Sequence, residues 1–292
     1  MHPVLFKIFS FPIHSYGLML ALSFLFGIWY SSRLAQKRGL NPDVIADVGF
    51  WIILSAIVGS RAYYVILHFE EFKDNLLSII NPFQNGAVGI GGLVMLGGFF
   101  GAILAGFIYF RVKKISFLPY ADVMAPSAGF GIMLTRIGCF LNGCGYGGAS
   151  NSSLAVHFPA ESPAGFYQNH IHAASLYPSQ LFEYFGGLII ALILIFVGTR
   201  KNIFTGLQFY LLGLFYAVLR FLVDYSRFYS DNERLFGLSH NQVFCIILFL
   251  VFGGLILRGY LLKNETKPDN KNDQPDTTSK QDSLKISEPV SQ

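Results

Sequence analysis

Residues 181–198 read LFEYFGGLIIALILIFVG, and Glu183 is the only charged residue among them. A helix needs about 20 mostly apolar residues to cross the hydrocarbon core of a bilayer. Stretches of this kind recur along the chain and predict an all-α integral membrane protein with about seven transmembrane helices. The expected spans are 15–32, 44–67, 87–110, 119–141, 181–198, 205–225 and 241–261.

The composition of the whole chain agrees with a protein that lies in a lipid bilayer. Of its 292 residues, 53% are hydrophobic and 13% are charged, whereas soluble domains carry about 25% charged residues. This composition argues against a soluble globule and against a coiled coil. The net charge is +4, but no basic patch is dense enough for nucleic acid, so no nucleic-acid partner is expected.

Basic residues concentrate in alternate connections between the predicted spans. They occur at 33–38, 111–114, 200–201 and 258–285, while the opposite connections hold few. Cytoplasmic loops of membrane proteins carry an excess of Lys and Arg. The pattern therefore predicts an N-terminus outside the cell and a C-terminus in the cytoplasm.

The polar segments divide the chain further. Residues 1–263 are expected to form the transmembrane domain. Within it, residues from about 145 to 180 contain several prolines but no Lys or Arg, and they predict a small irregular head on the periplasmic side. Residues 264–292 are polar without an apolar period, so they predict a disordered cytoplasmic tail.

The segment 135–147, TRIGCFLNGCGYG, brings polar groups to the end of the fourth predicted span. Glycines let backbone N–H groups approach a ligand closely. Asn142 supplies donors and an acceptor, and the guanidinium of Arg136 matches the geometry of a phosphate. The alternative is an arginine that extends to the interface beside a glycine-rich helix contact. The spacing fits both interpretations.

Two further arginines lie in or near predicted spans, where a charge costs about 2.5–3.5 kcal/mol on insertion scales. Tyr216, Arg220, Asp224 and Arg227 are spaced i, i+4, i+8 and i+11, so they share one helix face. Arg220 can pair with Asp224, which would be a structural salt bridge. Arg61 could pair with a neighbouring helix. Binding of an anionic ligand is the other interpretation of both arginines.

The cysteines and histidines show no metal-site pattern. Cys139 and Cys144 are five residues apart, which is not the CxxC spacing of zinc sites, and three cysteines are too few for a disulfide framework. His14 and Tyr16 lie at the outer end of the first span. A tyrosine there is most often an interface anchor, and the histidine could accept a proton.

Six segments, taken in order, resemble the prolipoprotein diacylglyceryl transferase family of bacterial inner-membrane enzymes. They are His14-Ser-Tyr16-Gly17-Leu-Met, Gly59-Ser-Arg61, Gly91-Gly92-Leu-Val-Met-Leu-Gly97-Gly98, Arg136-Ile-Gly138-Cys-Phe-Leu-Asn142-Gly143, Pro178-Ser179-Gln180-Leu-Phe-Glu183 and Tyr216-Ala-Val-Leu-Arg220. The resemblance covers residues 1 to about 260, and the segments with Arg136 and Glu183 are the most specific.

The resemblance implies a reaction and its partners. The diacylglyceryl group of phosphatidylglycerol would move to the lipobox cysteine thiol in the signal peptide of a prolipoprotein. A thioether would form and glycerol 1-phosphate would leave. Neither a metal nor an organic cofactor is implied.

The resemblance also implies roles for particular residues. Arg136 would hold the lipid headgroup, and Arg220 would be a second cation over the charge that develops on the leaving phosphate. The other implied residues are Asn142, Gly143, Tyr16, Arg61 and Tyr216 for substrate binding, and Glu183 and Asp224 for holding the arginines.

The chain departs from the family pattern at two positions. Many members carry histidine or tyrosine where Leu96 stands, and that histidine has been proposed as the base; a histidine also often stands where this chain has Tyr177. Leu96 cannot accept a proton, so either His14 is the base or nearby cations lower the pKa of the substrate thiol, ordinarily about 8.5, until none is needed. Cys139 and Cys144 occupy positions that vary in the family and are interpreted as packing residues.

Two other functions stay open at this point. A paralogue could bind phosphatidylglycerol but use a different acceptor, which the residues Leu96 and Tyr177 suggest. A non-catalytic transporter of lipids or anions would also need arginines inside the membrane.

Overall fold

The computed structural model describes residues 2–8, 11–73, 79, 83–84, 87–88, 94–200, 203–227, 234–235 and 237–265. The long helices of this part are α1 (Ser15–Lys37), α2 (Asp43–Leu67), α3 (Met95–Lys113), α4 (Phe117–Asn142), α6 (Ser179–Gly198), α7 (Leu207–Asp224) and α8 (His240–Glu265). All seven are long and apolar enough to cross a membrane. The prediction of an all-α integral membrane protein is therefore confirmed.

The third predicted span, 87–110, is wrong at its start. Ala87–Val88 form strand β4, which pairs with β3 (Phe83–Gln84), and α3 begins only at Met95. Hydropathy counts the glycines and valines before Met95 as apolar, but glycine disfavours a helix by about 1 kcal/mol per residue relative to alanine. Gly91 and Gly92 lie outside the described residues. Most of the predicted tail, 264–292, also lies outside them, and its first two residues belong to α8.

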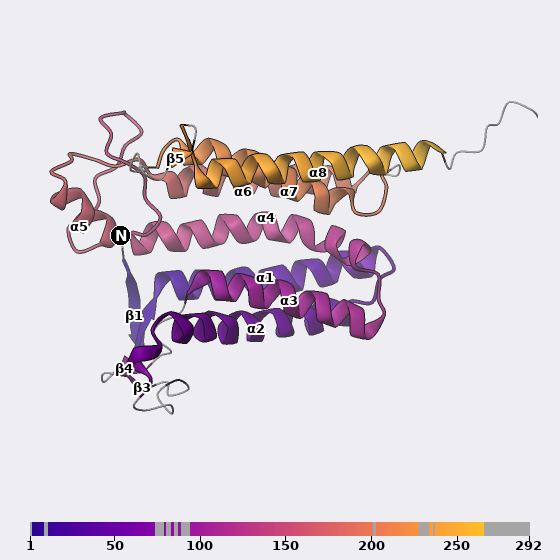
Figure 1. Ribbon diagram of the computed structural model, residues 1–292, viewed down its shortest axis with the longest axis horizontal. Coiled ribbons are helices and arrows are strands. Elements are labelled where there is room, and N and C mark those ends of the chain that lie inside the picture. Colours follow the sequence, from indigo (N-terminus) through magenta and orange to yellow (C-terminus); the bar gives the residue numbers. More distant parts are fainter. Residues whose placement is uncertain are drawn as a thin grey trace, which may run out of the picture.

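The long helices run side by side in two groups with α4 between them (Figure 1). On one side α4 packs against α1, which also contacts α2, and α3 packs on α2. On the other side α4 packs against α6 and α7, and α8 covers α7. Residues near the end of α4 are therefore positioned to meet residues from both groups.

Small residues allow the helices to approach closely. A Cβ atom on Gly97 of α3 would overlap the carbonyl oxygen of Gly59 and the Cβ of Tyr63 on α2. A Cβ on Gly138 of α4 would lie 3.1 Å from the Cα of Tyr16 on α1. Glycine at such positions lets membrane helices pack backbone against backbone.

The connection between α4 and α6, residues 143–178, forms the head. It contains the short helix α5 (Pro163–His170), whose first turn is capped by the Ser162 hydroxyl, and a small core of Phe158, Ala164 and Leu176. The rest is irregular, as predicted.

The strands lie at the same end of the bundle as the head (Figure 1). Within the described residues they form three two-stranded hairpins, and a 3-10 turn, Phe69–Glu71, follows α2. The strands not yet introduced are β1 (Val4–Ile8), β2 (Phe11–His14), β5 (Arg234–Leu235) and β6 (Leu238–Ser239).

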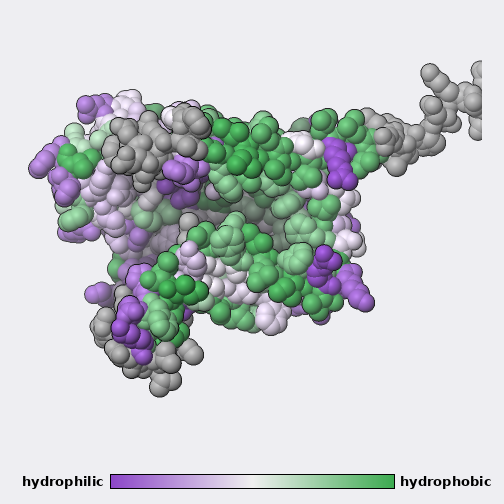
Figure 2. Space-filling model, in the orientation of Figure 1, coloured by the Kyte–Doolittle hydropathy of each residue, from purple (hydrophilic) through white to green (hydrophobic). Residues whose placement is uncertain are grey.

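The surface has the polarity that a bilayer requires. Figure 2 shows hydrophobic residues over the middle of the bundle and hydrophilic residues at its two ends. Large side chains such as Trp29, Phe50, Phe99 and Leu250 are exposed on the helix faces. The belt is exposed because burial of the helix faces within the protein is incomplete. An exposed apolar belt of this kind is stable in contact with lipid.

Candidate functional site

Three arginines converge on one buried carboxylate, Glu183. This residue lies in the first turns of α6 and is 1% exposed. Arg136 Nη2 is 2.5 Å from Glu183 Oε2, Arg220 Nη1 is 3.0 Å from Oε1, and Arg227 Nη2 is 3.2 Å from Oε1. The arginines come from α4, from α7 and from the turn that follows α7, so the cluster joins three parts of the fold.

Positive charge exceeds negative charge in this cluster. Arg220 also pairs with Asp224, at 3.4 Å between Nη2 and Oδ1, as the sequence spacing predicts. In the part of the chain that the structure describes, three guanidinium groups thus share two carboxylates. Guanidinium groups stay protonated, so a partly buried excess of positive charge is best compensated by an anion. The arginine side chains are 14–23% exposed, which leaves them accessible to a ligand.

Arg136 contacts Glu183 through a different carboxylate oxygen from the other two arginines. Its contact with Glu183 Oε2 is an ion pair by distance, and within the described residues this buried oxygen has no well-aligned hydrogen bond. By contrast, Arg220 and Arg227 both donate hydrogen bonds to Oε1. Arg136 also donates from Nη1 to the sulfur of Cys139 at 3.7 Å, so its guanidinium links Glu183 to the end of α4.

The backbone after α4 lies against the arginines. Gly145 has a φ of +70°, and a Cβ atom there would be 3.5 Å from Arg136 Nη1 and 3.8 Å from Arg227 Nη2. Gly143 also has positive φ, and its carbonyl accepts a hydrogen bond from the N–H of Ala164 in the head. These glycines bring the head onto the cluster.

The structure brings several of the other predicted residues to the same place. Tyr16, in the first turn of α1, is within electrostatic reach of Arg136. Tyr216, one turn before Arg220 on α7, is within electrostatic reach of Glu183, Arg220 and Arg136. Asn142 ends α4 and hydrogen-bonds the thiol of Cys144.

Arg61 and His14 lie in different surroundings. Arg61 is buried, donates from Nε to the carbonyl of Ile79 at 2.9 Å, and stacks on Phe72 at 5.0 Å from the ring centroid. These contacts belong to the α2–α3 connection and not to the Glu183 cluster. His14 is exposed at the end of β2. Leu96 is 47% exposed near the start of α3.

Sequence reasoning placed Arg227 on the helix face of Arg220 but gave it no role in the site, and it missed the central position of Glu183. Arg227 lies three residues after Asp224, which is helical spacing, so the signal was present in the sequence. No sequence signal indicated the partner of Gln180. The side chain of Gln180 donates a hydrogen bond to the carbonyl of Cys144 at 3.0 Å and so ties α6 to the head. Among the described residues, no group of three or more His, Cys, Asp and Glu could hold a metal ion.

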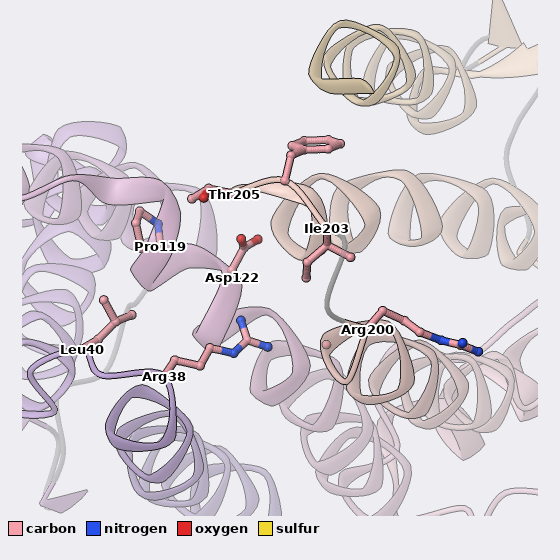
Figure 3. Close-up of a pocket in the computed structure, with 9 residues that line it drawn as sticks. Arg38, Leu40, Pro119, Asp122, Arg200, Ile203 and Thr205 are labelled. Atoms are coloured by element: carbon pink, nitrogen blue, oxygen red, sulfur yellow. The ribbon is translucent and has the colours of Figure 1, made fainter. Parts of the chain in front are cut away.

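A second polar hollow, of about 310 Å³, lies at the opposite end of the bundle (Figure 3). Asp122 on α4 accepts hydrogen bonds from the backbone N–H groups of Gly206 and Phe209, and so caps the start of α7. Arg38 extends into the hollow and donates to Gln208 on α7, whereas Arg200 points away. These bonds fix the junction of α1, α4 and α7 and explain its buried polar groups.

An apolar groove of about 720 Å³ runs along α3. Its lining comes from α2, α3, α4 and α7, and Figure 2 shows the surface hollowed between the two groups of helices. The apolar lining residues include Ile52, Phe99, Ile103, Phe107, Phe110, Phe117 and Phe209. Their character suits a hydrocarbon chain.

The fold and the site together define a multi-pass membrane protein with an anion-attracting cluster at one end of its helices. The family model for prolipoprotein diacylglyceryl transferase matches residues 3–258. The chain belongs to this family, and it is a transferase of lipoprotein biosynthesis.

Curated relatives carry the same name. The phosphatidylglycerol–prolipoprotein diacylglyceryl transferase 1 of Clostridium perfringens is 37% identical over 197 residues, which are 68% of this chain and 71% of the relative. The enzyme of Bacillus cytotoxicus is 32% identical over 248 residues, 82% of this chain and 86% of the relative. That of Bacillus licheniformis is 31% identical over 267 residues, 88% and 92%.

Proposed function

We propose that the chain transfers the diacylglyceryl group of phosphatidylglycerol to the lipobox cysteine of a prolipoprotein. The observation that carries this proposal is the convergence of Arg136, Arg220 and Arg227 on Glu183, with more positive than negative charge. The names of the relatives support the same two substrates.

The chemistry needs a stabilised phosphate leaving group. The thiolate attacks the glyceryl carbon next to the phosphate ester oxygen, a C–S bond forms, and the C–O bond breaks with its electrons on glycerol 1-phosphate. Arg136 and Arg220 bind the phosphate and stabilise the charge that develops on it, which fixed cations do well in a site of low dielectric. Glu183 and Asp224 hold the arginines in place for this role.

The headgroup also needs to be oriented. Tyr16 and Tyr216 interact electrostatically with the arginines, and Asn142 and Gly143 end α4 next to Cys144. These four residues would supply hydroxyl, amide and backbone groups to the headgroup. Arg61 is a substrate-binding residue in this proposal only if the lipid extends to the α2–α3 connection. The acyl chains can lie in the apolar groove along α3, which opens between the two helix groups.

The substrate thiol must lose its proton before it attacks. Leu96 cannot accept it, and His14 is exposed at the rim of the bundle, so a base role for His14 requires the signal peptide to pass there. A thiol placed beside the arginines would ionise more easily because nearby cations lower its pKa. No metal or organic cofactor enters this reaction.

The site would face the outside of the bacterial inner membrane. Lys37, Lys113 and Lys263 lie in the last turns of α1, α3 and α8, all at the end of the bundle away from the head. Because positive residues favour the cytoplasmic side, the head and the N-terminus would lie outside and the C-terminus in the cytoplasm.

The test is Arg136→Ala in the full-length protein, in vesicles that contain phosphatidylglycerol and a lipobox peptide. We expect formation of the diacylglyceryl thioether to fall by at least about 100-fold, as when an oxyanion-stabilising donor is removed. Mass spectrometry detects the lipidated peptide. Arg33→Ala is the matched control, since Arg33 is exposed near the end of α1 that lies away from the head. Unchanged lipidation by Arg136→Ala would contradict the assignment.

The same assay separates the two alternatives. A paralogue with another acceptor, suggested by Leu96 and Tyr177, would neither lipidate the lipobox peptide nor release glycerol phosphate while its own acceptor is missing. It would also fail to complement a strain depleted of its own transferase. A transporter would move lipid or anions between compartments and release no glycerol phosphate. Release in proportion to the lipidated peptide would exclude both.

A further inference from the structure

The turn that ends α4 places two cysteines side by side. The Cys144 N–H donates to the Cys139 carbonyl at 3.0 Å, and the Gly143 N–H donates to the Phe140 carbonyl at 3.3 Å, with Gly143 in the left-handed conformation. This is the Schellman pattern of helix ends, in which the side chains of the first and last residues come into contact. Here those residues are Cys139 and Cys144, and their thiols hydrogen-bond each other.

The surroundings favour a reactive thiol at Cys144. The side chain of Cys139 is buried, whereas Cys144 is partly exposed, and neither is in a disulfide. Arg136 Nη1 lies 3.7 Å from the Cys139 sulfur. The hydrogen bond from Cys139 lowers the pKa of Cys144 to about 6, with help from Asn142 and Arg136 and against the effect of burial. Cys144 is therefore largely thiolate at neutral pH, the form that attacks disulfides.

We propose that Cys144 and Cys139 form a reactive dithiol pair that exchanges with low-molecular-weight disulfides and closes a disulfide beside the arginine cluster. In the first step the Cys144 thiolate attacks one sulfur of the disulfide, forms a mixed disulfide and releases one small thiolate. That thiolate takes the proton of Cys139. The Cys139 thiolate then attacks the Cys144 sulfur and releases the second small thiolate, which takes a proton from water.

The two steps reduce one external disulfide to two thiols and oxidise the protein by two electrons. Contact between the side chains at the two ends of the turn makes the second step intramolecular, so the mixed disulfide is short-lived. This chemistry does not depend on the proposed transfer reaction. It replaces the interpretation of Cys139 and Cys144 as packing residues with that of a modification site.

The test treats the full-length protein in detergent with oxidised glutathione at neutral pH. The reaction is quenched with acid, and the free thiols are alkylated with N-ethylmaleimide in SDS. Of the three cysteines in the chain, we expect three to be alkylated before oxidation and only Cys245 afterwards. The peptide that contains Cys139 and Cys144 should lose two hydrogen atoms in mass. Three alkylated cysteines after oxidation would overturn the proposal.

Variants assign the two roles. Cys139→Ser should stop at a stable glutathione adduct on Cys144, and Cys144→Ser should form neither product. Cys245→Ser is the matched control and should still close the disulfide. If the Cys139→Ser variant still elutes as a folded protein but forms no glutathione adduct, Cys144 is not the attacking thiol and the proposal fails.

A measurement on the native sequence keeps the proposal testable if a variant misfolds. The rate of Cys144 alkylation by iodoacetamide should be near its maximum at pH 7 and should fall as the pH drops through about 6, where Cys144 becomes protonated. A midpoint near the ordinary thiol value of about 8.5 would contradict the proposal.

Discussion

Glu183 is the residue on which the site depends. It is buried, it carries the only charge in the first half of α6, and it contacts guanidinium groups from two other helices and a turn. A buried carboxylate in apolar surroundings would ordinarily be costly. The three arginines compensate this cost, and in return the carboxylate fixes their positions around a space that an anion can enter.

We predict that Glu183→Gln destabilises the protein and abolishes transfer. The substitution leaves three guanidinium groups with the single carboxylate of Asp224, and removing one partner of a buried ion pair typically costs about 3–5 kcal/mol. Thermal unfolding in detergent would show a lower midpoint temperature. Glu161→Gln is the matched control, because Glu161 is exposed in the head, and an equal effect of both substitutions would refute a special role of Glu183.

At the scale of elements, the contact of α2 with α3 rests on glycine. The backbones at Gly59 and Gly97 meet without side chains between them. This packing holds α3 against α2 and leaves its other face, which bears Phe99 and Phe107, exposed along the apolar groove. The groove therefore exists because α3 packs through one face only.

We predict that Gly97→Ala destabilises the bundle, since its Cβ atom would overlap the backbone of Gly59. Overpacking of this kind costs about 1–3 kcal/mol. Gly27→Ala in α1 is the control, because a Cβ atom at Gly27 meets nothing within 4 Å and alanine favours a helix. Thermal unfolding of the two variants in the same detergent compares them, and a higher midpoint temperature for Gly97→Ala than for Gly27→Ala would contradict the packing argument.

At the scale of the whole molecule, the two ends of the bundle differ in chemistry. The head end carries the arginine cluster, the glycine-rich turn and the reactive cysteines. The other end carries the lysines in the last turns of α1, α3 and α8. It also carries the junction in which Asp122 caps α7. This asymmetry gives the protein a defined direction in the membrane.

We predict that a fluorescent protein fused after Glu265 folds and fluoresces, because the proposed orientation puts the C-terminus in the cytoplasm. Alkaline phosphatase inserted in the head near Ser153 should be active, since that enzyme needs an oxidising compartment to form its disulfides. The two fusions control for each other in the same cells. The reverse pattern of activities would show that the head faces the cytoplasm.

Sequence patterns were sufficient for the helices and for part of the site. Hydropathy located seven spans, and helical spacing paired Arg220 with Asp224. Hydropathy failed at the start of α3, because an average over residues does not distinguish the strand at Ala87–Val88 from a helix. The segment with Arg136 and its glycines was recognisable because polar groups are costly in a span.

The sequence by itself determined that this protein spans a membrane, which end of its helices is basic and which arginines need an explanation. Only the tertiary structure decided that Arg136, Arg220 and Arg227 share one carboxylate and that Arg61 lies elsewhere. The reason is physical. Hydrophobicity and helical spacing act within a segment and can be read along the chain, whereas the meeting of α4, α6 and α7 at Glu183 depends on how separate helices pack.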